Sequence, residues 1–431
     1  MYKRQVLVRA VRRAEDSTLQ RISRLVQEAQ ASRAPAERFV DRFSRVYTPL
    51  VVVAALGVAA VPPLFGGDPG TWFYRGLALL VIACPCSLVI STPVTVVSGI
   101  GAAARSGMLI KGGEALEAAG SLRALLLDKT GTLTEGRPVV ERVLPLRGTR
   151  EEAVALAAAL ERRSEHPLAH AILSAAGEGP LPEVAGFRSI PGRGAEGEVG
   201  GRRYVIGSPA LFAERGVPLE AARPALREVE AAGETPVVLG DEAGPVAVFG
   251  LADAVRPEAP EAIRALREAG VEELVMLTGD AEAPARRVAE ALGIGYRARL
   301  LPGEKVGVVR ELVAKHGAAG MAGDGVNDAP ALAAASVGFA MGAAGSDAAL
   351  EVADVALMQD DLRRLAGAVR LSRAARRTIK QNIFLSILIK GTFVALAPFG
   401  LVTLWLAVLA DMGTSIGVTL NGLRLFAGRR W

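Results

Sequence analysis

Four long apolar stretches restrict the folds open to this chain more than any other feature of its sequence. They cover residues 46–67, 76–104, 378–397 and 401–423. A helix that crosses a bilayer needs about 20 mostly apolar residues, and each stretch meets that requirement. Because 51% of the 431 residues are hydrophobic, an ordinary soluble domain is disfavoured. We therefore predict a multi-domain membrane protein with an α-helical bundle of four spans.

The charges around these stretches predict the orientation of the chain. Arginines and lysines flank the start of the first and third stretches and the end of the second and fourth. By the positive-inside rule, both termini and the long segment between the second and third stretches are cytoplasmic. The chain has 50 Lys and Arg residues against 45 Asp and Glu residues, and no basic stripe is interleaved with aromatic residues. We therefore expect no nucleic-acid partner.

The heptad Asp128–Thr134 directly follows the apolar run Leu125–Leu127. A buried strand that ends in a carboxylate and a glycine turn places that carboxylate at the carboxyl edge of a sheet, where α/β folds place their chemistry. Asp128 is therefore a candidate nucleophile that forms an aspartyl phosphate, and Lys129 and the Thr130 hydroxyl suit a phosphoryl group. A lone aspartate after a strand is more often a helix cap, but the whole heptad favours catalysis.

Two later segments supply what phosphoryl transfer still needs. Thr278-Gly279-Asp280 follows one apolar run, and Gly323–Asp328 follows another. Asp324 and Asp328 are four residues apart and can face one Mg²⁺ together with Asp128 and Thr130, because that ion prefers a few carboxylates plus substrate oxygens. Between them, Lys305 offers a positive charge to phosphoryl oxygens. Each piece alone is an ordinary turn or surface lysine, but together they predict one site.

These segments resemble the phosphorylation domain of P-type ATPases, whose catalytic core has the haloacid-dehalogenase-like fold. Cys84–Cys86 and Ser164–Leu168 narrow the resemblance to the heavy-metal-transporting branch, and it extends from about Asp16 to the C-terminus. It implies a cytoplasmic α/β phosphorylation domain with an inserted α+β nucleotide-binding domain. It also implies ATP as substrate, Mg²⁺ as cofactor, a transported metal ion, and a multi-pass position in the plasma membrane.

The resemblance and the patterning together divide the chain into six segments. We expect a remnant of an actuator domain and linker at 1–31, the first two spans at 32–111, the first part of the phosphorylation domain at 112–140, the nucleotide-binding domain at 141–240, the second part of the phosphorylation domain at 241–370, and the last two spans at 371–431.

The resemblance also assigns the nucleotide site. It implies that His166 stacks on or hydrogen-bonds the adenine, that Glu161 lies beside it, and that Gly192 and Gly194 let the backbone approach the nucleotide. Taken alone, a Gly-x-Gly sequence is weak evidence. A His-Pro pair is more often an irregularity in a helix.

The transport site is expected where the second span breaks. A proline inside a helix removes one backbone hydrogen bond, so Pro85 and Pro93 should unwind or kink this span. Cys84 and Cys86 flank Pro85, and thiolates suit soft or borderline ions such as Zn²⁺, Cd²⁺, Pb²⁺ or Cu⁺. Their separation by a single residue is a poor geometry for a disulfide. Buried membrane cysteines alone would be unremarkable.

Two charges inside the spans bear on the choice of metal. A charge at mid-membrane costs about 2.5 to 3.5 kcal/mol, so Lys390 and Asp411 need a reason to be there, of which mutual pairing is the simplest. In the zinc, cadmium and lead branch the matching aspartate lies near the metal and the matching lysine acts as a counter-ion. Copper pumps typically place asparagine, tyrosine, methionine and serine in these helices. Asn421 and Met412 are present without that arrangement, so a Cu⁺ pump remains the alternative.

The sequence departs from the family in one respect. The family's actuator domain carries a Thr-Gly-Glu loop that activates water, and no Thr-Gly-Glu occurs in this sequence. We expect the chain to be the C-terminal two-thirds of a pump whose missing N-terminal part is its partner. A soluble phosphatase of the same fold is disfavoured by the spans and by Thr130, where such enzymes usually have a second aspartate. A non-catalytic membrane remnant also stays open.

Overall fold

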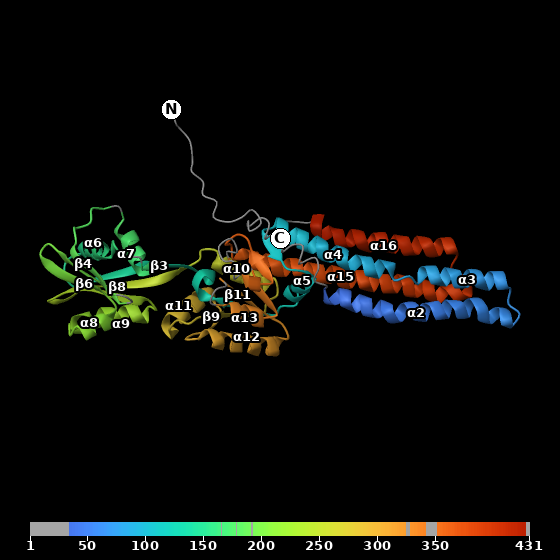
Figure 1. The fold of residues 1–431 in the computed structure, drawn as a ribbon, viewed down its shortest axis with the longest axis horizontal. Coiled ribbons are helices and arrows are strands. Elements are labelled where there is room, and N and C mark those ends of the chain that lie inside the picture. The colour runs from blue at the N-terminus through green and yellow to red at the C-terminus, as the bar shows by residue number, and fades with distance from the viewer. Residues whose placement is uncertain are drawn as a thin grey trace, which may run out of the picture.

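The computed structural model describes residues 34–164, 166–177, 179–190, 193–324, 328–341 and 351–427. Three parts follow one another along the length of the molecule (Figure 1). A helical bundle forms one end, a mostly parallel sheet with its helices lies in the middle, and an antiparallel sheet with its helices forms the other end.

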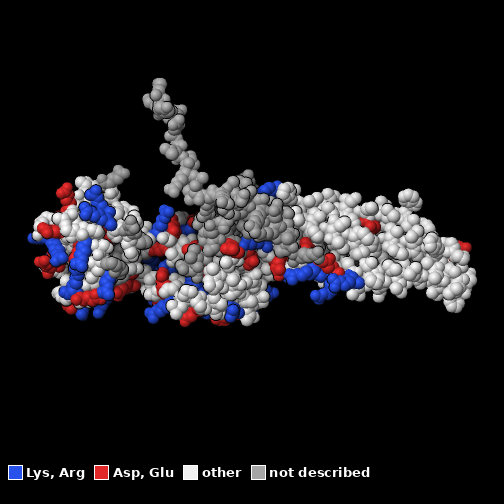
Figure 2. Space-filling view, viewed as in Figure 1, with Lys and Arg blue, Asp and Glu red and all other residues white. Residues whose placement is uncertain are grey.

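The bundle consists of the apolar helices that the sequence predicts. They are α2 (Pro35–Leu64), α3 (Pro69–Ile82), α4 (Cys86–Arg105), α15 (Arg363–Leu396) and α16 (Leu404–Ala427), with a short 3₁₀ turn at Ala397–Phe399 after α15. Four units in the described part of the chain are long and apolar enough to cross a membrane, with α3 and α4 counted as one. Figure 2 shows charged side chains over the two sheet-containing parts and almost none along the bundle. The prediction of four spans is confirmed.

The second span is interrupted at the predicted proline. α3 ends at Ile82 and α4 begins at Cys86, so that Cys84 and Pro85 lie between two helices. Pro93, in contrast, lies within α4 and does not end it. Only one of the two prolines therefore opens the backbone in the middle of the span.

The middle part is a seven-stranded sheet in the order β1-β13-β12-β11-β2-β9-β10. All neighbouring strands are parallel except the pair β1 and β13. The strands are β1 (Met108–Ile110), β2 (Ala124–Asp128), β9 (Glu273–Leu277), β10 (Gly295–Arg297), β11 (Ala319–Gly323), β12 (Val337–Ala340) and β13 (Val355–Leu357). β2 lies between β11 and β9 and is buried along its length, which explains its run of leucines.

Helices cover both faces of this sheet. One face packs on α5 (Gly113–Ala119), α10 (Ala259–Glu268), α11 (Glu282–Leu292) and the first turns of α15. The other face packs on α12 (Pro302–His316) and α13 (Ala329–Ala334). Because α15 continues from this core into the bundle, the sheet and the membrane helices share one continuous element (Figure 1).

The third part is a six-stranded antiparallel sheet in the order β3-β8-β7-β6-β5-β4. Its strands are β3 (Thr134–Pro145), β4 (Ala185–Ile190), β5 (Gly194–Val199), β6 (Arg202–Gly207), β7 (Thr235–Asp241) and β8 (Gly244–Val255). The helices α6 (Arg150–Glu161) and α7 (Pro167–Ala176) pack on one face; α8 (Pro209–Glu214), the 3₁₀ turn Glu220–Ala222 and α9 (Arg223–Ala231) pack on the other.

The strand β8 lies within residues 241–370, the segment that the sequence analysis assigned to the second part of the phosphorylation domain. It pairs with β3 from Thr134↔Val255 to Pro145↔Ala247 and belongs to the antiparallel sheet. These two long strands form the connection between the two sheets, and Thr134 directly follows the loop after Asp128. The boundaries of the domains remain predictions.

Candidate functional site

The carboxyl edge of the parallel sheet gathers the predicted acidic residues. Asp128 is the last residue of β2, whose neighbours are β9 and β11. Thr278-Gly279-Asp280 follows β9, and Asp324 follows β11. Three segments that lie far apart in the sequence therefore end at the same edge, where parallel sheets place their ligands.

Lys305 joins two of these carboxylates. Its Nζ, which comes from the first turns of α12, donates hydrogen bonds to Asp128 Oδ1 at 2.6 Å and to Asp328 Oδ1 at 2.7 Å. All three side chains are buried. Asp324 lies on the other side of the turn after Asp128: a Cβ at Gly131, whose φ is +77°, would lie 3.2 Å from Asp324 Oδ2. Glycine at this position therefore allows both the turn and the close approach of Asp324.

The pKa values of Asp128 and Lys305 at this edge are set by their burial and by the charged groups close to them. Burial, followed by the negative charge of Asp328, raises the pKa of Asp128 to about 6 against the opposing effect of Lys305; Asp324 adds to the rise. Burial disfavours the charge on Lys305, but Asp128 and Asp328 outweigh it and raise the pKa of the lysine. A site with this excess of carboxylates suits a cation as well as a lysine.

The other predicted catalytic residues surround this centre. Lys129 Nζ forms an ion pair with Asp280. The Thr278 hydroxyl is buried and accepts a hydrogen bond from the Asp280 backbone N–H at 3.1 Å. Thr130 and Gly279 are exposed. The structure thus brings Lys129 to Asp280 and leaves Thr130 exposed.

Two residues that the sequence did not single out hold the loop after Asp128. Arg256, just after β8, donates to the carbonyl oxygens of Gly131 at 2.9 Å and Thr134 at 3.2 Å. Asp253 accepts from the Thr134 hydroxyl at 2.5 Å and from the Arg137 backbone N–H at 3.1 Å. The sequence positions of Arg256 and Asp253 do not distinguish them from ordinary surface residues, because their contacts with the loop form only when β8 pairs with β3.

The predicted nucleotide residues line one cavity of about 210 Å³ in the antiparallel part. It brings together Glu161, His166 and Gly194, with Ser164 and Thr235 among the other lining residues. Burial raises the pKa of Glu161, while a hydrogen bond with Ser164 and the charge of His166 oppose the rise. The fourth predicted residue, Gly192, lies outside the described residues.

A second cavity, of about 200 Å³, is lined by residues from both sheet-containing parts. Its lining includes Lys129 and Asp280, from loops at the edge of the parallel sheet, and Gly233 and Thr235, from the antiparallel part. Thr235 lines both cavities, so the two adjoin at this residue. An extended ligand could therefore reach from the region of His166 to the edge that carries Asp128.

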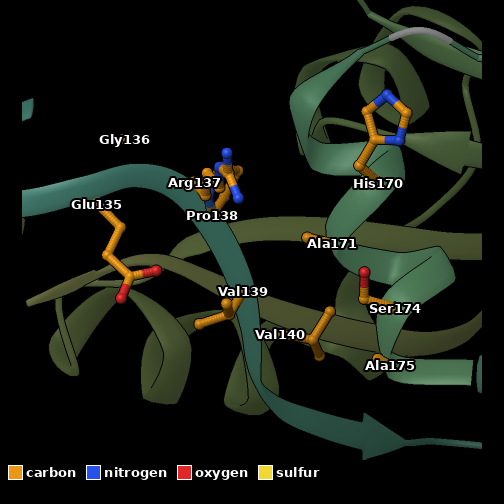
Figure 3. A pocket seen from close by; sticks show the side chains of 10 residues that line it. All are labelled: Glu135, Gly136, Arg137, Pro138, Val139, Val140, His170, Ala171, Ser174 and Ala175. Carbon is orange, nitrogen blue, oxygen red and sulfur yellow. The ribbon is translucent and has the colours of Figure 1, made fainter. Parts of the chain in front are cut away.

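A larger cavity of about 760 Å³ lies against the first half of β3 and the outer side of α7 (Figure 3). Glu135 and Arg137 on β3, and His170 and Ser174 on α7, are its polar residues. It shares no lining residue with the two cavities above. No residue of the predicted sites faces it.

The two cysteines at the break in the second span form a disulfide, with Cα atoms 5.4 Å apart. The expectation that their spacing is a poor geometry for a disulfide is therefore wrong. Cα atoms two residues apart are about 5.4 Å apart even in a regular helix, which is within the usual disulfide range, so a single intervening residue does not exclude the bond. Thiolate ligands require the reduced form of this pair.

The two membrane charges meet at the same break. Lys390 Nζ contacts the carbonyl oxygen of Cys84 and donates a hydrogen bond of 2.5 Å to Asp411 Oδ1. Mutual pairing, the simple explanation for two such charges, is thus present. In the part of the chain that the structure describes, no three His, Cys, Asp or Glu side chains stand close enough to hold a metal ion, either here or at Asp128.

Comparisons with known proteins agree with this arrangement. The haloacid dehalogenase-like hydrolase family matches residues 122–336. The chain is 46% identical to a probable cadmium-transporting ATPase of Staphylococcus aureus, over 97% of this chain and 59% of that protein. It is 45% identical to the zinc/cadmium/lead-transporting P-type ATPase of Escherichia coli, over 96% of this chain and 56% of that protein. The chain thus spans less than two thirds of these relatives.

Among solved structures, the crystal structure of a zinc-transporting PIB-type ATPase in an E2·Pi state is similar to this one, with a TM-score of 0.83 and 44% sequence identity. The match covers 96% of this chain and 68% of that chain. This match agrees with the position of Asp128 at the sheet edge and with the Cys-Pro-Cys sequence at the break in the second span. The chain belongs to the PIB-type branch of the P-type ATPase family.

Proposed function

We propose that this chain carries the phosphorylation, nucleotide-binding and ion-binding parts of a pump that uses ATP to export divalent heavy-metal ions, namely Zn²⁺, Cd²⁺ or Pb²⁺. The observation that carries the proposal is the contact of Lys305 with Asp128 at the carboxyl edge of β2. A buried lysine beside a strand-end aspartate provides both the nucleophile and a positive charge for the phosphoryl oxygens.

Asp128 takes the γ-phosphoryl group of ATP, forming an aspartyl phosphate and releasing ADP. Lys305 stabilises the charge on the phosphoryl oxygens. Lys129, Thr130 and the Thr278-Gly279-Asp280 turn position the group beside Asp128. The ion pair of Lys129 with Asp280 supports this assignment because it ties the two loops together.

The carboxylates at this edge are of the kind that Mg²⁺ prefers, although no three of the described ones stand close enough to hold an ion in the present arrangement. Asp128, Asp324 and Asp328 would hold the ion, with Thr130 beside them; a few carboxylates plus substrate oxygens are the ligands it prefers. The crowding that raises the pKa of Asp128 is the observation that favours a cation here. When bound, Mg²⁺ neutralises charge on the phosphate oxygens.

ATP extends along the two adjoining cavities. Its base lies beside Glu161 and His166, with Gly192 and Gly194 giving the backbone room to approach. The triphosphate passes Thr235 toward Lys129. The support for this path is that Thr235 lines both cavities.

The transported ion binds at the break in the second span. Cys84 and Cys86, when reduced, and Asp411 provide sulfur and oxygen ligands, and Lys390 is the counter-ion when the site is empty. The contact of Lys390 with both the Cys84 carbonyl and Asp411 supports a shared site. A carboxylate beside two thiolates favours a borderline divalent ion over Cu⁺, which soft ligands alone serve well.

The chain spans the cell membrane several times, with the two sheet-containing parts and both termini on the cytoplasmic side. The arginines on the first turns of α2, together with the arginines and lysine of α15 near the parallel sheet, support this orientation.

The decisive experiment is phosphorylation of this protein. With Mg²⁺ and γ-labelled ATP, we expect an acid-stable, hydroxylamine-labile phosphoenzyme on Asp128 and none in Asp128→Asn. The variant should still bind nucleotide. Equal label in the two proteins, with nucleotide binding intact, would rule out Asp128 as the nucleophile.

The choice of ion needs a separate readout. In the same protein, Zn²⁺, Cd²⁺ and Pb²⁺ should stimulate ATP hydrolysis more than Cu⁺ does under reducing conditions. A stronger response to Cu⁺ than to Zn²⁺ would assign the Cys84–Cys86 site to copper.

A further inference from the structure

Glu234 is a buried carboxylate at the border between the two sheet-containing parts. It directly precedes β7, and only 2% of its side chain is exposed. Arg142 on β3 donates two hydrogen bonds to it from Nε, at 2.8 and 3.0 Å. A Cβ at Gly250, on the neighbouring strand β8, would lie 1.9 Å from Glu234 Oε2, so the glycine makes room for the carboxylate. The antiparallel part thus holds this buried charge in a fixed, paired position.

Arg287 brings a second guanidinium to Glu234 from the other part. It lies on α11, at the end of the middle part that faces the antiparallel sheet (Figure 1). Its Nη1 is 3.5 Å from Glu234 Oε1, and its Nη2 is 4.0 Å from Glu141 Oε1. Since Glu141 and Glu234 both belong to the antiparallel part, the ion pairs of Arg287 connect the two parts.

The backbones of the two parts also meet beside this ion pair. A Cβ at Gly233 would lie 2.7 Å from the carbonyl oxygen of Ala283, in the first turn of α11. The φ of Gly233 is +69°, so a side chain is disfavoured there by the backbone conformation as well as by the contact. The turn before Glu234 therefore fits directly against the helix that carries Arg287.

This contact lies at the second of the two adjoining cavities. Gly233 and Arg287 line that cavity, and Thr235 lines both. In the proposed function the antiparallel part holds the base of ATP, whereas Asp128 belongs to the parallel sheet. Transfer of the phosphoryl group therefore requires the two parts to stay together while the reaction takes place.

We propose that Glu234 is a positioning residue for phosphoryl transfer. Its ion pair with Arg287 stabilises the closed arrangement, in which the turn at Gly233 touches α11, and so keeps the triphosphate within reach of Asp128. The inference rests on the proposed function, since it assumes that ATP passes between the two parts. Because 32% of the Arg287 side chain is exposed, water can replace the ion pair, which favours closure without preventing the release of ADP.

The first test is single-turnover phosphorylation of this protein by Mg²⁺-ATP. Arg287→Met removes the charge and should slow formation of the aspartyl phosphate by about tenfold. This is less than the roughly hundredfold cost of a displacement of about 1 Å, because the parts still meet at Gly233. The affinity for adenosine should stay unchanged, since Arg287 does not line the cavity at His166. Arg287→Lys keeps the positive charge and should recover most of the rate.

A double-mutant cycle distinguishes the ion pair from a direct contact of Arg287 with the triphosphate. Glu234→Gln keeps the shape of the side chain and an acceptor for Arg142, but it removes the charge that attracts Arg287. Alone, it should slow phosphorylation about as much as Arg287→Met does. In the Arg287→Met background it should cause no further slowing. Effects of the two substitutions that multiply would overturn the proposal.

Arg286→Met is the matched control. Arg286 is the neighbouring residue on α11, is exposed and lines neither of the two cavities. Its substitution should leave the rate of phosphorylation unchanged. If it slows the reaction as much as Arg287→Met does, the effect is a general one of the helix and the proposal is overturned.

A second test measures closure without relying on activity. Spin labels at Glu198→Cys on β5 and Arg310→Cys on α12, both exposed positions, report the distance between the two parts. Cys84 and Cys86 are replaced by serine for this measurement. Arg287→Met should lengthen and broaden the distance between the labels, and an unchanged distance overturns the proposal. If the wild type forms no phosphoenzyme, the proposed function fails, and the distance alone decides whether the ion pair holds the parts together.

Discussion

The guanidinium of Arg256 donates a hydrogen bond of 2.9 Å to the carbonyl oxygen of Gly131, across 125 residues of sequence. The same side chain also donates to Thr134, so it holds both the middle and the end of the turn that follows Asp128. It pairs in addition with Asp360, just before α15, which continues into the membrane. One buried arginine therefore links the loop of the nucleophile to the helix that carries Lys390.

We expect Arg256→Lys to slow phosphorylation of Asp128 by about a hundredfold, because a displacement of about 1 Å in a reacting group has that effect. Lysine keeps the charge but cannot reach two carbonyl oxygens at once. Single-turnover labelling measures the rate, and nucleotide affinity should not change because Arg256 lines neither of the two cavities assigned to ATP. Arg310→Lys, at an exposed position on α12, is the control and should behave as the wild type.

The raised pKa of Asp128 predicts a pH-dependent stability. The usual value is 3.8 and the folded value is about 6, so the folded state holds this proton more tightly than the unfolded state. Between these two pH values the contribution of Asp128 to stability falls as pH rises. Asp128→Asn removes this loss and should unfold at a higher temperature than the wild type at pH 7.5.

The size of that difference is on the order of 2 kcal/mol, from about 1.4 kcal/mol per pKa unit with some relaxation of the site. Thermal unfolding of the purified chain, without Mg²⁺ or nucleotide, should show the gap at pH 7.5 and its disappearance near pH 4. Glu135→Gln, at an exposed carboxylate nearby, should show no gap. A wild type more stable than Asp128→Asn at pH 7.5 would contradict the sign.

Thr235 offers a test of the nucleotide path. Thr235→Val keeps the shape of the side chain and removes the hydroxyl where the two cavities adjoin. Loss of one hydrogen bond to a charged triphosphate should weaken ATP binding by about tenfold. Adenosine, which lacks the triphosphate, should bind equally well to both proteins. Equal losses for ATP and adenosine would place Thr235 at the base instead.

Periodicity and strand-end chemistry were enough to predict the central strand and the edge that carries Asp128, because Leu125–Leu127 are buried on both faces of the sheet. The same reasoning misplaced β8. Its first eight residues are also buried on both faces, so their sequence reads like a parallel strand although they pair antiparallel with β3. Continuous burial shows that a strand is central to a sheet but does not show which sheet.

The limits of prediction at the sites have a similar cause. Asp128 ends a strand and Asp280 and Asp324 come after strands, and these positions are visible in the sequence. Arg256 and Thr235 acquire their contacts only from the pairing of distant strands. The disulfide of Cys84 with Cys86 depends on the side-chain torsions of the two cysteines, which residue spacing does not determine.

Substitutions at Lys390 and Asp411 can distinguish a role of Asp411 in stability from a role in ion binding. Each single substitution, Asp411→Asn or Lys390→Met, leaves one charge unpaired inside the bundle and should lower the unfolding temperature in detergent. The double variant removes both charges and should recover most of that loss, with a coupling of about 1 to 3 kcal/mol. It should not recover Zn²⁺ binding by the reduced chain, because the carboxylate ligand is absent. Recovery of both stability and Zn²⁺ binding would show that Asp411 serves only to neutralise Lys390.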